Sequence, residues 1–364
     1  MGFLGSLLNS IMKILNIKIL KAGNGDSILI NFIDDIGLSR NILIDGGNKK
    51  SEFNNNLKCE VLDIQNKKEN IDLLIITHTD QDHIKGIYYL LNDYDIDKNI
   101  IKEIWFNSFY PINEFQNSEN NDISFIESCK VQTLIDELGL NRKSNIYLPN
   151  INKFDFMNLK FTILSPYHDD VEKLKIENLK NNPSIDISSN TNDYNFTISE
   201  LIEKNSIIFV HKKEDLDDKI ENRVSIAFLL EYNSKSILFL GDANSDIVVK
   251  SLREIIIERN IDKLKVDYVK LSHHASHRSL GFDLLDIIDC NNFIISANGG
   301  KANLPNKLTI AKILSRRNRD SKADTFIFNY DEVLEKLNFS DFDYKEYNFN
   351  SILTNYKNGY KIDL

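Results

Sequence analysis

Ile71-Asp72-Leu73-Leu74-Ile75-Ile76 runs directly into Thr77-His78-Thr79-Asp80-Gln81-Asp82-His83. The first part is mostly apolar and stops abruptly at polar residues, as expected of a short strand that is buried on both faces. The second part brings together four side chains of metal-binding type: His78, Asp80, Asp82 and His83. The pattern predicts a metal site where a buried strand turns into a helix that begins near Ile84.

The spacing of these side chains predicts two divalent metal ions. In an extended segment, residues two apart point the same way, so His78 and Asp80 can share one ion. As the chain turns into the helix, Asp82 and His83 swing towards a second ion. Imidazole and carboxylate together suit Zn²⁺ or Mn²⁺, and no thiolate is needed. The alternative is a merely polar turn in which Asp82 caps the helix.

Two later segments also place ligand-type residues just beyond an apolar strand. Gly241-Asp242 follows a predicted strand at 236–240, and Ser272-His273-His274 follows a predicted strand at 266–271. Active sites of layered α/β proteins gather at such strand ends. We therefore expect Asp242 to bridge both ions and one of His273 and His274 to complete the second site. The other histidine of the pair is expected to be a core or supporting residue.

Several motifs follow one another in a recognisable order along the chain. They are Ala22-Gly23-Asn24-Gly25-Asp26-Ser27, Leu43-Ile44-Asp45-Gly46-Gly47, Thr77 to His83 with Gly86, Asn222-Arg223-Val224-Ser225, Gly241-Asp242 and His273-His274-Ala275-Ser276. In this order they resemble the metallo-β-lactamase fold and, within it, the hydrolase domain of ComEC-type DNA-uptake proteins. Asp80 stands where most such relatives carry a second His. The chain end, Leu353 to Ile362, resembles the closing hairpin of that group.

The resemblance implies an α+β fold, a four-layer αββα sandwich with the metal ions in a groove at one edge of two facing sheets. The ligands it implies are His78, Asp80, Asp82, His83, Asp242 and one of His273 and His274. It also implies that Asp45 and Ser276, with His277 beside the site, orient the ligands.

The chain departs from the family pattern in two places. Ala275 replaces the usual Gly, and Leu304 stands before Pro305 where the family has a late His. A late metal ligand or catalytic group is therefore missing, or another residue of the chain supplies it. His168, His211 and His277 are the candidates to replace it, although each is also explained as an ordinary loop histidine.

The rest of the sequence predicts a single domain over residues 1–364, with insertions or a cap within 108–222. The polar stretch from His168 to about Asn195 and the charged one from Lys212 to Asn222 bury little apolar surface. The other expected elements are strands at 15–20, 27–32, 41–44, 103–106, 159–164, 225–231 and 292–297, and helices at 84–91, 125–138, 245–259 and 308–314.

The amino-acid composition limits the kinds of partner that we expect for the protein. A formal net charge of −10 argues against a protein that coats nucleic acid. The basic cluster at 316–319 is interpreted as a solvated helix end, with a phosphate contact as the alternative. Three cysteines without a CxxC pair favour a reducing, cytoplasmic compartment. No apolar run approaches the roughly 20 residues of a membrane span, and the mildly amphipathic segment 1–11 is interpreted as a short helix or an extension.

These features predict a metal-dependent hydrolase in which a metal-bound hydroxide attacks the substrate and Asp82 or Asp242 orients it. A phosphodiesterase or nuclease, acting on nucleic acid or another phosphodiester, is the first hypothesis because of the ComEC-like motifs. The second is a hydrolase of small-molecule esters, lactones or thioesters. The third is a non-catalytic binding or regulatory module with a protein partner. The oligomeric state does not follow from the sequence.

Overall fold

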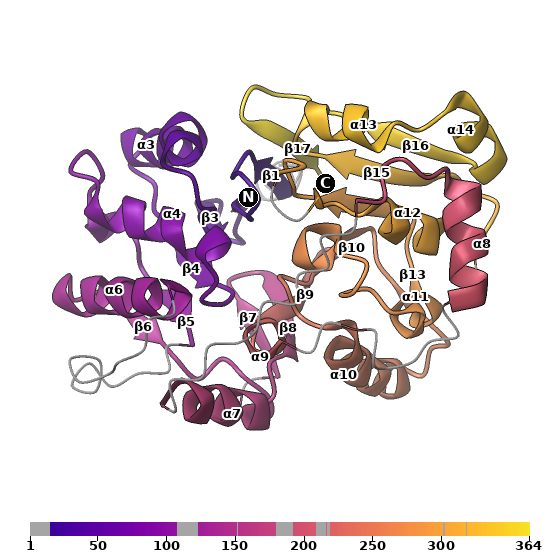
Figure 1. The fold of residues 1–364 in the computed structure, drawn as a ribbon. Helices are drawn as coiled ribbons and strands as arrows, with labels where there is room; N and C mark the ends of the chain where they lie inside the picture. The colour runs from indigo at the N-terminus through magenta and orange to yellow at the C-terminus, as the bar shows by residue number, and fades with distance from the viewer. Residues whose placement is uncertain are drawn as a thin grey trace, which may run out of the picture.

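The computed structural model describes residues 15–107, 123–150, 152–179, 192–208, 216, 219–300, 303–317 and 319–364. Among these residues two large β-sheets face each other, and helices cover the outer side of each (Figure 1). The first sheet has the strand order β17-β1-β2-β3-β4-β5-β6, and the second has the order β16-β15-β14-β12-β10-β9-β8-β7.

The elements have the following bounds. The strands of the first sheet are β1 Leu15–Leu20, β2 Ile28–Ile33, β3 Ser39–Ile44, β4 Leu73–Ile76, β5 Ile104–Phe106, β6 Arg142–Lys143 and β17 Gly359–Asp363. Those of the second are β7 Lys153–Phe156, β8 Leu159–Ser165, β9 Ala227–Tyr232, β10 Lys235–Phe239, β12 Tyr268–Lys270, β14 Asn292–Ile295, β15 Asp324–Phe328 and β16 Phe349–Ile352, while β11 Leu264–Lys265 pairs with β13 Ile288–Asp289. The helices are α2 Lys50–Glu52, η1 Phe53–Leu57, α3 Lys58–Asn66, α4 Gln81–Asn92, η2 Lys98–Ile100, α6 Ile123–Glu137, α7 His168–Leu179, α8 Ile198–Ile208, α9 Ile220–Arg223, α10 Ser245–Arg259, η4 Ser272–Ala275, α11 Phe282–Ile287, α12 Lys307–Leu314, α13 Asp331–Leu337 and α14 Asp341–Tyr347.

Strand β4 shows why the sandwich has four layers. Leu73 and Ile75 enter the apolar core between the two sheets, whereas Leu74 and Ile76 enter a second core beneath the helices on the outer side. A third core lies between the second sheet and its own helices. In Figure 1, α3, α4 and α6 flank the first sheet on the left, and α8, α10 and α12 lie on the right. The predicted αββα sandwich is confirmed.

In each sheet, the pairing of neighbouring strands changes from antiparallel to parallel at one point. In the first sheet β1, β2 and β3 are antiparallel neighbours, and β4 then pairs parallel with β3. In the second sheet β8, β9 and β10 are antiparallel, and β12 then pairs parallel with β10. Because the carboxyl ends of parallel neighbours meet at one edge, the segments after β3 and β4 converge there, as do those after β10 and β12.

The predicted closing hairpin over residues 353–362 is confirmed in its turn, where Tyr356 and Gly359 exchange backbone hydrogen bonds at 3.4 and 3.2 Å, but its two ends do not pair with each other along their length. Strand β16 pairs parallel with β15 in the second sheet, whereas β17 pairs antiparallel with β1 in the first. The segment between them therefore passes from one sheet to the other. Asp331 anchors this crossing, since it accepts hydrogen bonds from the backbone N–H and the hydroxyl of Thr354 at 2.9 Å each.

The interpretation of the basic cluster at 316–319 as a solvated helix end is wrong for Arg316 and Arg319, whereas Arg317 is exposed as predicted. Arg316 is buried and donates two hydrogen bonds, at 2.8 and 2.7 Å, to the fully buried Asp324. Arg319 donates to the same carboxylate at 2.7 Å. A carboxylate shielded from water needs such counter-charges, so these two arginines stabilise the start of β15.

The polar stretch that begins at His168 is more regular than predicted. It starts with helix α7, which packs Val171 and Leu174 against Ile220 and Val224. The many charged residues around this helix concealed its apolar side in the sequence.

Residues 180–191 and 209–215 of the predicted insertion, including His211, lie outside the described part, as does segment 1–11. That residues 1–364 form a single domain stays a prediction. No described helix is long and apolar enough to cross a membrane.

Candidate metal centre

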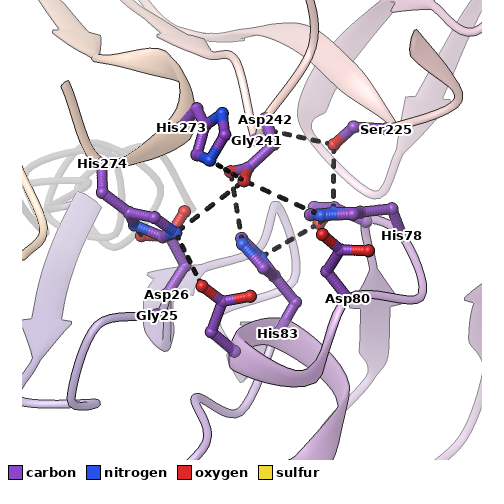
Figure 2. A network of polar contacts seen from close by, with 12 residues as sticks. Gly25, Asp26, His78, Asp80, His83, Ser225, Gly241, Asp242, His273 and His274 are labelled. Atoms are coloured by element: carbon purple, nitrogen blue, oxygen red, sulfur yellow. Dashed lines mark hydrogen bonds and ion pairs between the residues drawn. The ribbon is translucent and has the colours of Figure 1, made fainter. Parts of the chain in front are cut away.

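Polar side chains from four strand ends meet at one edge of the sandwich. They follow β3, β4, β10 and β12, and Figure 2 shows His78, His83, His273 and His274 around Asp242. Within this cluster, two groups offer ligand atoms that lie within 4.8 Å of one another: His78 with His83 and Asp242, and Asp82 with His83 and His274. Segments that are distant in sequence therefore form one compact donor set.

Asp45 holds the strand end and the helix start together. Its carboxylate accepts hydrogen bonds from the N–H of Thr77 at 2.8 Å, from the hydroxyl of Thr77 at 2.7 Å and from Nδ1 of His83 at 2.8 Å. Asp45 is fully buried. It therefore fixes the ring of His83 and leaves Nε2 directed at Asp242, 3.2 Å from Oδ1.

The three buried histidines share one hydrogen-bond arrangement. Nδ1 of His78 lies 3.0 Å from the hydroxyl oxygen of Thr77, and Nδ1 of His274 lies 3.0 Å from the carbonyl oxygen of Ser296. Nδ1 of His83 faces Asp45 as described. In each ring Nδ1 is placed to donate, which leaves Nε2 as the atom that can bind a metal ion, the usual arrangement of a metal-binding histidine.

His274 and His273 approach Asp242 from different directions. Nε2 of His274 lies 3.8 Å from Asp242 Oδ2 and 3.5 Å from Asp82 Oδ2, and the residue is buried. His273 is 28% exposed, and its Nε2 lies 3.9 Å from Asp242 Oδ2. Both residues have a positive φ, and Nε2 of each lies near the same oxygen of Asp242. His274 therefore has the more enclosed position of the two.

Asp80 lies at the edge of the centre with a partner of its own. Nζ of Lys219, the residue before α9, is 3.1 Å from Asp80 Oδ2. None of the three groups of clustered ligand atoms in the described chain includes Asp80, although it lies beside His78 in Figure 2. The pairing of His78 and Asp80 expected from their spacing is thus replaced by His78 with His83 and Asp242.

The remaining predicted residues have supporting or remote places. Ser276 donates its backbone N–H to the carbonyl of His273 at 2.9 Å, within the histidine loop. The backbone N–H and Nδ1 of His277 lie 3.0 and 2.9 Å from Oδ1 of Asn306, which follows Pro305. Asn306 therefore holds both the backbone and the ring of His277 in place. His168 is half exposed on α7, beside Asp169 and Glu172.

Sequence reasoning missed two lysines at this site. Lys270 forms a buried ion pair with Asp26, and Lys219 forms the pair with Asp80. Lys270 carried a signal, because a lysine within an otherwise apolar strand that leads into two histidines is unusual for a buried segment. Lys219 carried no such signal in the sequence, because it lies in the charged stretch interpreted as an insertion.

Two motif glycines are required by close backbone contacts. A Cβ on Gly25 would lie 1.6 Å from the carbonyl oxygen of Asp82, and one on Gly86 would lie 1.8 Å from the carbonyl oxygen of Gly46. The loops after β1 and β3 therefore press directly on the start of α4. This packing sets the position of Asp82.

Charge in the centre favours bound cations. Burial raises the pKa of Asp242, but the neighbouring His83 and His274 outweigh it and hold this pKa well below its usual range. Burial lowers the pKa of His274, but Asp242 and Asp26 outweigh it and raise this pKa to about 10. The carboxylates thus draw protons onto the imidazoles, and divalent cations would compete for the same positions.

The donor set fits divalent metal ions. Six buried atoms of histidine and aspartate side chains in and around the centre have no hydrogen-bond partner: Nε2 of His78, His83 and His274, and Oδ1 of Asp242, Asp80 and Asp26. Leaving several polar atoms unpaired in a protein interior is costly unless another group satisfies them. Nitrogen and carboxylate oxygen are suitable donors for such ions.

Comparison with known proteins agrees with the architecture. Residues 21–157, which include the segment from His78 to His83, match the family model described as the Metallo-beta-lactamase superfamily. With the two-sheet sandwich, this match supports the metallo-β-lactamase fold. The search of curated proteins returned no match.

Several solved structures are similar at low identity. The metallo-beta-lactamase fold protein YhfI from Bacillus subtilis is 12% identical, with 97% of this chain and 100% of that chain covered and a TM-score of 0.41. Zn²⁺-bound PqqB from Methylobacterium extorquens is 8% identical, with 96% and 100% covered and a TM-score of 0.42. A long form RNase Z from yeast is 11% identical, with 78% and 36% covered and a TM-score of 0.34. These scores are too low to carry an inference about activity.

Proposed function

We propose that the protein is a metal-dependent hydrolase of phosphodiesters, with nucleic acid or another phosphodiester as its substrate. The observation that carries the proposal is the set of buried, unpartnered ligand atoms on His78, His83, His274 and Asp242. The order of the ComEC-like motifs supports the substrate class. Zn²⁺ or Mn²⁺ is the proposed metal, because the donors are imidazoles and carboxylates.

The residues would divide between two ions. His78 would hold one ion, Asp82 and His274 would hold the other, and the two oxygens of Asp242 can serve both. His83 belongs to both groups, but its single free nitrogen can bind only one ion. When bound, the ions would supply Lewis acidity that brings the pKa of a coordinated water towards neutrality and offsets charge on the leaving oxygen.

Asp82 has the position of a group that orients water at the reacting centre. Its side chain is 29% exposed, whereas that of Asp242 is 2% exposed. Burial raises the pKa of Asp82, but the neighbouring His274 and His83 outweigh it and hold this pKa below its usual range. Asp82 is therefore ionised and open to the solvent side, where its carboxylate can accept a hydrogen bond from an attacking water and orient it.

Lys219 favours an anionic substrate. Its ammonium group lies beside Asp80 at the edge of the centre and has three N–H donors. A bound phosphodiester keeps one negative charge that an amine can hold, whereas a carboxylic ester, lactone or thioester is neutral at its reacting carbonyl. Lys219 would thus anchor a non-bridging phosphate oxygen while the other groups orient the water.

The test measures hydrolysis by protein loaded with Mn²⁺ or Zn²⁺. Single- and double-stranded DNA, RNA and a generic diester are incubated with wild type and with Asp82→Ala, and metal content is measured for both. We expect diester hydrolysis that falls by at least about 100-fold in the variant, because the attacking water loses the group that orients it. Equal turnover in both proteins, or none in either, contradicts the proposal.

Two other outcomes would point to different functions. Hydrolysis of carbon esters, lactones or thioesters without hydrolysis of diesters would assign the centre to small-molecule substrates. A purified protein that carries almost no metal and acquires none when supplied would favour a binding or regulatory module.

A further inference from the structure

A buried ion pair links the two sheets next to the metal centre. Lys270 is the last residue of β12 in the second sheet, and Asp26 lies in the turn between β1 and β2 of the first. Nζ of Lys270 contacts Oδ2 of Asp26, and the two side chains are 1% and 2% exposed. The function proposed above does not use either residue.

Stability alone does not explain such a pair. Removing two charges from water is costly, and replacing a buried ion pair with uncharged side chains of similar size is often neutral or stabilising. The two residues are 244 positions apart in the sequence, so the pair does not arise from local structure. A role in the adjacent centre is the alternative that the contacts support.

Asp26 contacts the centre through His274. Asp26 Oδ1 lies 3.6 Å from Nδ1 of His274, on the side of the ring that faces away from Asp242. The neighbouring Ser296 accepts from the same Nδ1 and donates its hydroxyl to the carbonyl of Gly25 at 3.1 Å. Figure 2 shows Gly25 and Asp26 behind His274. The turn between β1 and β2 therefore lies behind the imidazole ring of His274.

The same turn also contacts the other ligand of this group. The backbone of Gly25 fits so closely against the carbonyl of Asp82 that no Cβ can be added. Asp82 Oδ2 and His274 Nε2 are 3.5 Å apart. The turn thus lies against both residues that would hold one ion, and Lys270 ties that turn to the second sheet.

Lys270 also occupies one oxygen of a potential ligand. Oxygens of Asp26 and Asp45 group with His83 as a further set of potential donors in the described chain. The ammonium group contacts Oδ2 of Asp26 and offsets the charge of this carboxylate, while Oδ1 faces Nδ1 of His274. Asp26 is thereby held against His274, and the charges of Asp82 and Asp242 remain to attract cations.

The geometry points to Lys270 and Asp26 as positioning residues that set the separation of Asp82 and His274 for one divalent cation. This inference rests on the metal centre of the proposed function but not on its substrate.

The experiment is a double-mutant cycle with Lys270→Met, Asp26→Asn and the double variant, together with Lys270→Arg. The full-length protein is stripped of metal, and its Tm is measured. Binding of Zn²⁺ and Mn²⁺ is then measured by competition with a chromophoric chelator, and the visible spectrum is recorded after loading with Co²⁺. Arg316→Met is the matched control, because it breaks a buried ion pair remote from the centre.

We expect each single charge removal to lower Tm by about 5–10 °C, because it leaves the other charge buried without a partner. Metal affinity should fall by about 10–100-fold for one of the two ions. The double variant should recover most of the Tm but keep the loss of affinity and an altered Co²⁺ spectrum. Lys270→Arg should bind metal more tightly than Lys270→Met, and Arg316→Met should lose Tm without losing affinity.

Recovery of metal affinity together with Tm in the double variant would overturn the inference, because the pair would then act only in folding. Wild-type affinity in the single variants would overturn it as well. Wild-type protein that takes up no metal would defeat the proposed function along with the inference. Metal uptake without diester hydrolysis would defeat the substrate assignment alone and leave the cycle interpretable.

Discussion

Replacing Asp45 by Asn tests whether this carboxylate sets the protonation of His83. Asn has nearly the same shape and tolerates the positive φ of 55° at this position. Its oxygen can still accept from the N–H of Thr77, but an NH₂ group then replaces the oxygen that accepts from Nδ1 of His83. That imidazole must move its proton to Nε2, which is the atom directed at the centre.

The size of the effect follows from the loss of one ligand. Outer hydrogen-bond partners of metal-binding histidines contribute about 10–100-fold to affinity, which corresponds to about 1.4–2.7 kcal/mol. Folding should lose about 1–3 kcal/mol, since one hydrogen bond between charged groups is replaced in a fully buried position. Metal-free Asp45→Asn should therefore fold, with a lower Tm and weaker metal binding.

The assay compares Asp45→Asn with Asp72→Asn. Asp72 is a buried carboxylate at the opposite end of β4 and accepts from the N–H of Asn41 at 2.9 Å. It should lose stability to a similar extent but keep wild-type metal affinity. Chelator competition measures the affinity, and thermal unfolding without metal measures the stability. Unchanged affinity in Asp45→Asn, or an equal loss in both variants, would refute the tautomer argument.

Three further predictions address other parts of the molecule. Lys219→Gln should lower kcat/KM for a diester by about 10-fold, with no change for a neutral ester, because one charge-assisted hydrogen bond is lost; Lys219→Arg should restore most of it, and an equal loss on both substrates would count against the role. Gly86→Ala should destabilise the fold by about 3 kcal/mol or more, because the added methyl would lie 1.8 Å from a backbone oxygen; urea unfolding measures this, and a cost under about 1 kcal/mol would contradict it. Burial raises the pKa of Cys129 and of Cys290 to about 12, whereas Cys59 is exposed; labelling at pH 8 should modify only Cys59 in the folded protein, and rapid labelling of all three would show the packing to be wrong.

Elements with a strong local pattern were predictable. Strand β4 reads as an apolar run that fills both faces of a sheet, and the structure buries Leu73, Leu74, Ile75 and Ile76 completely. Helix α10 has the predicted bounds because Asn244 caps its start and Asn260, in a left-handed conformation, ends it. Both asparagines are local signals that do not depend on the rest of the fold.

Elements that depend on distant partners were not predictable. The chain end resembles a closing hairpin, yet only its turn from Tyr356 to Gly359 pairs with itself, and β17 pairs with β1 of the first sheet. Arg316 looked like a solvated residue until Asp324 was placed beside it. The residues next to a side chain in sequence do not indicate its partner across the fold. The charge pattern alone therefore predicts that such a side chain faces solvent.

The candidate site divides in the same way. The stretch from His78 to His83 was legible because its donors are neighbours in sequence and follow a recognisable strand, so local geometry alone places them at a strand end. Tertiary structure alone decided their partners: Asp82 faces His274, and Asp80 faces Lys219 across 139 residues of sequence. Those pairings arise because two sheets bring their strand ends to one edge, and the distances there depend on how the sheets pack rather than on the residues next to each donor.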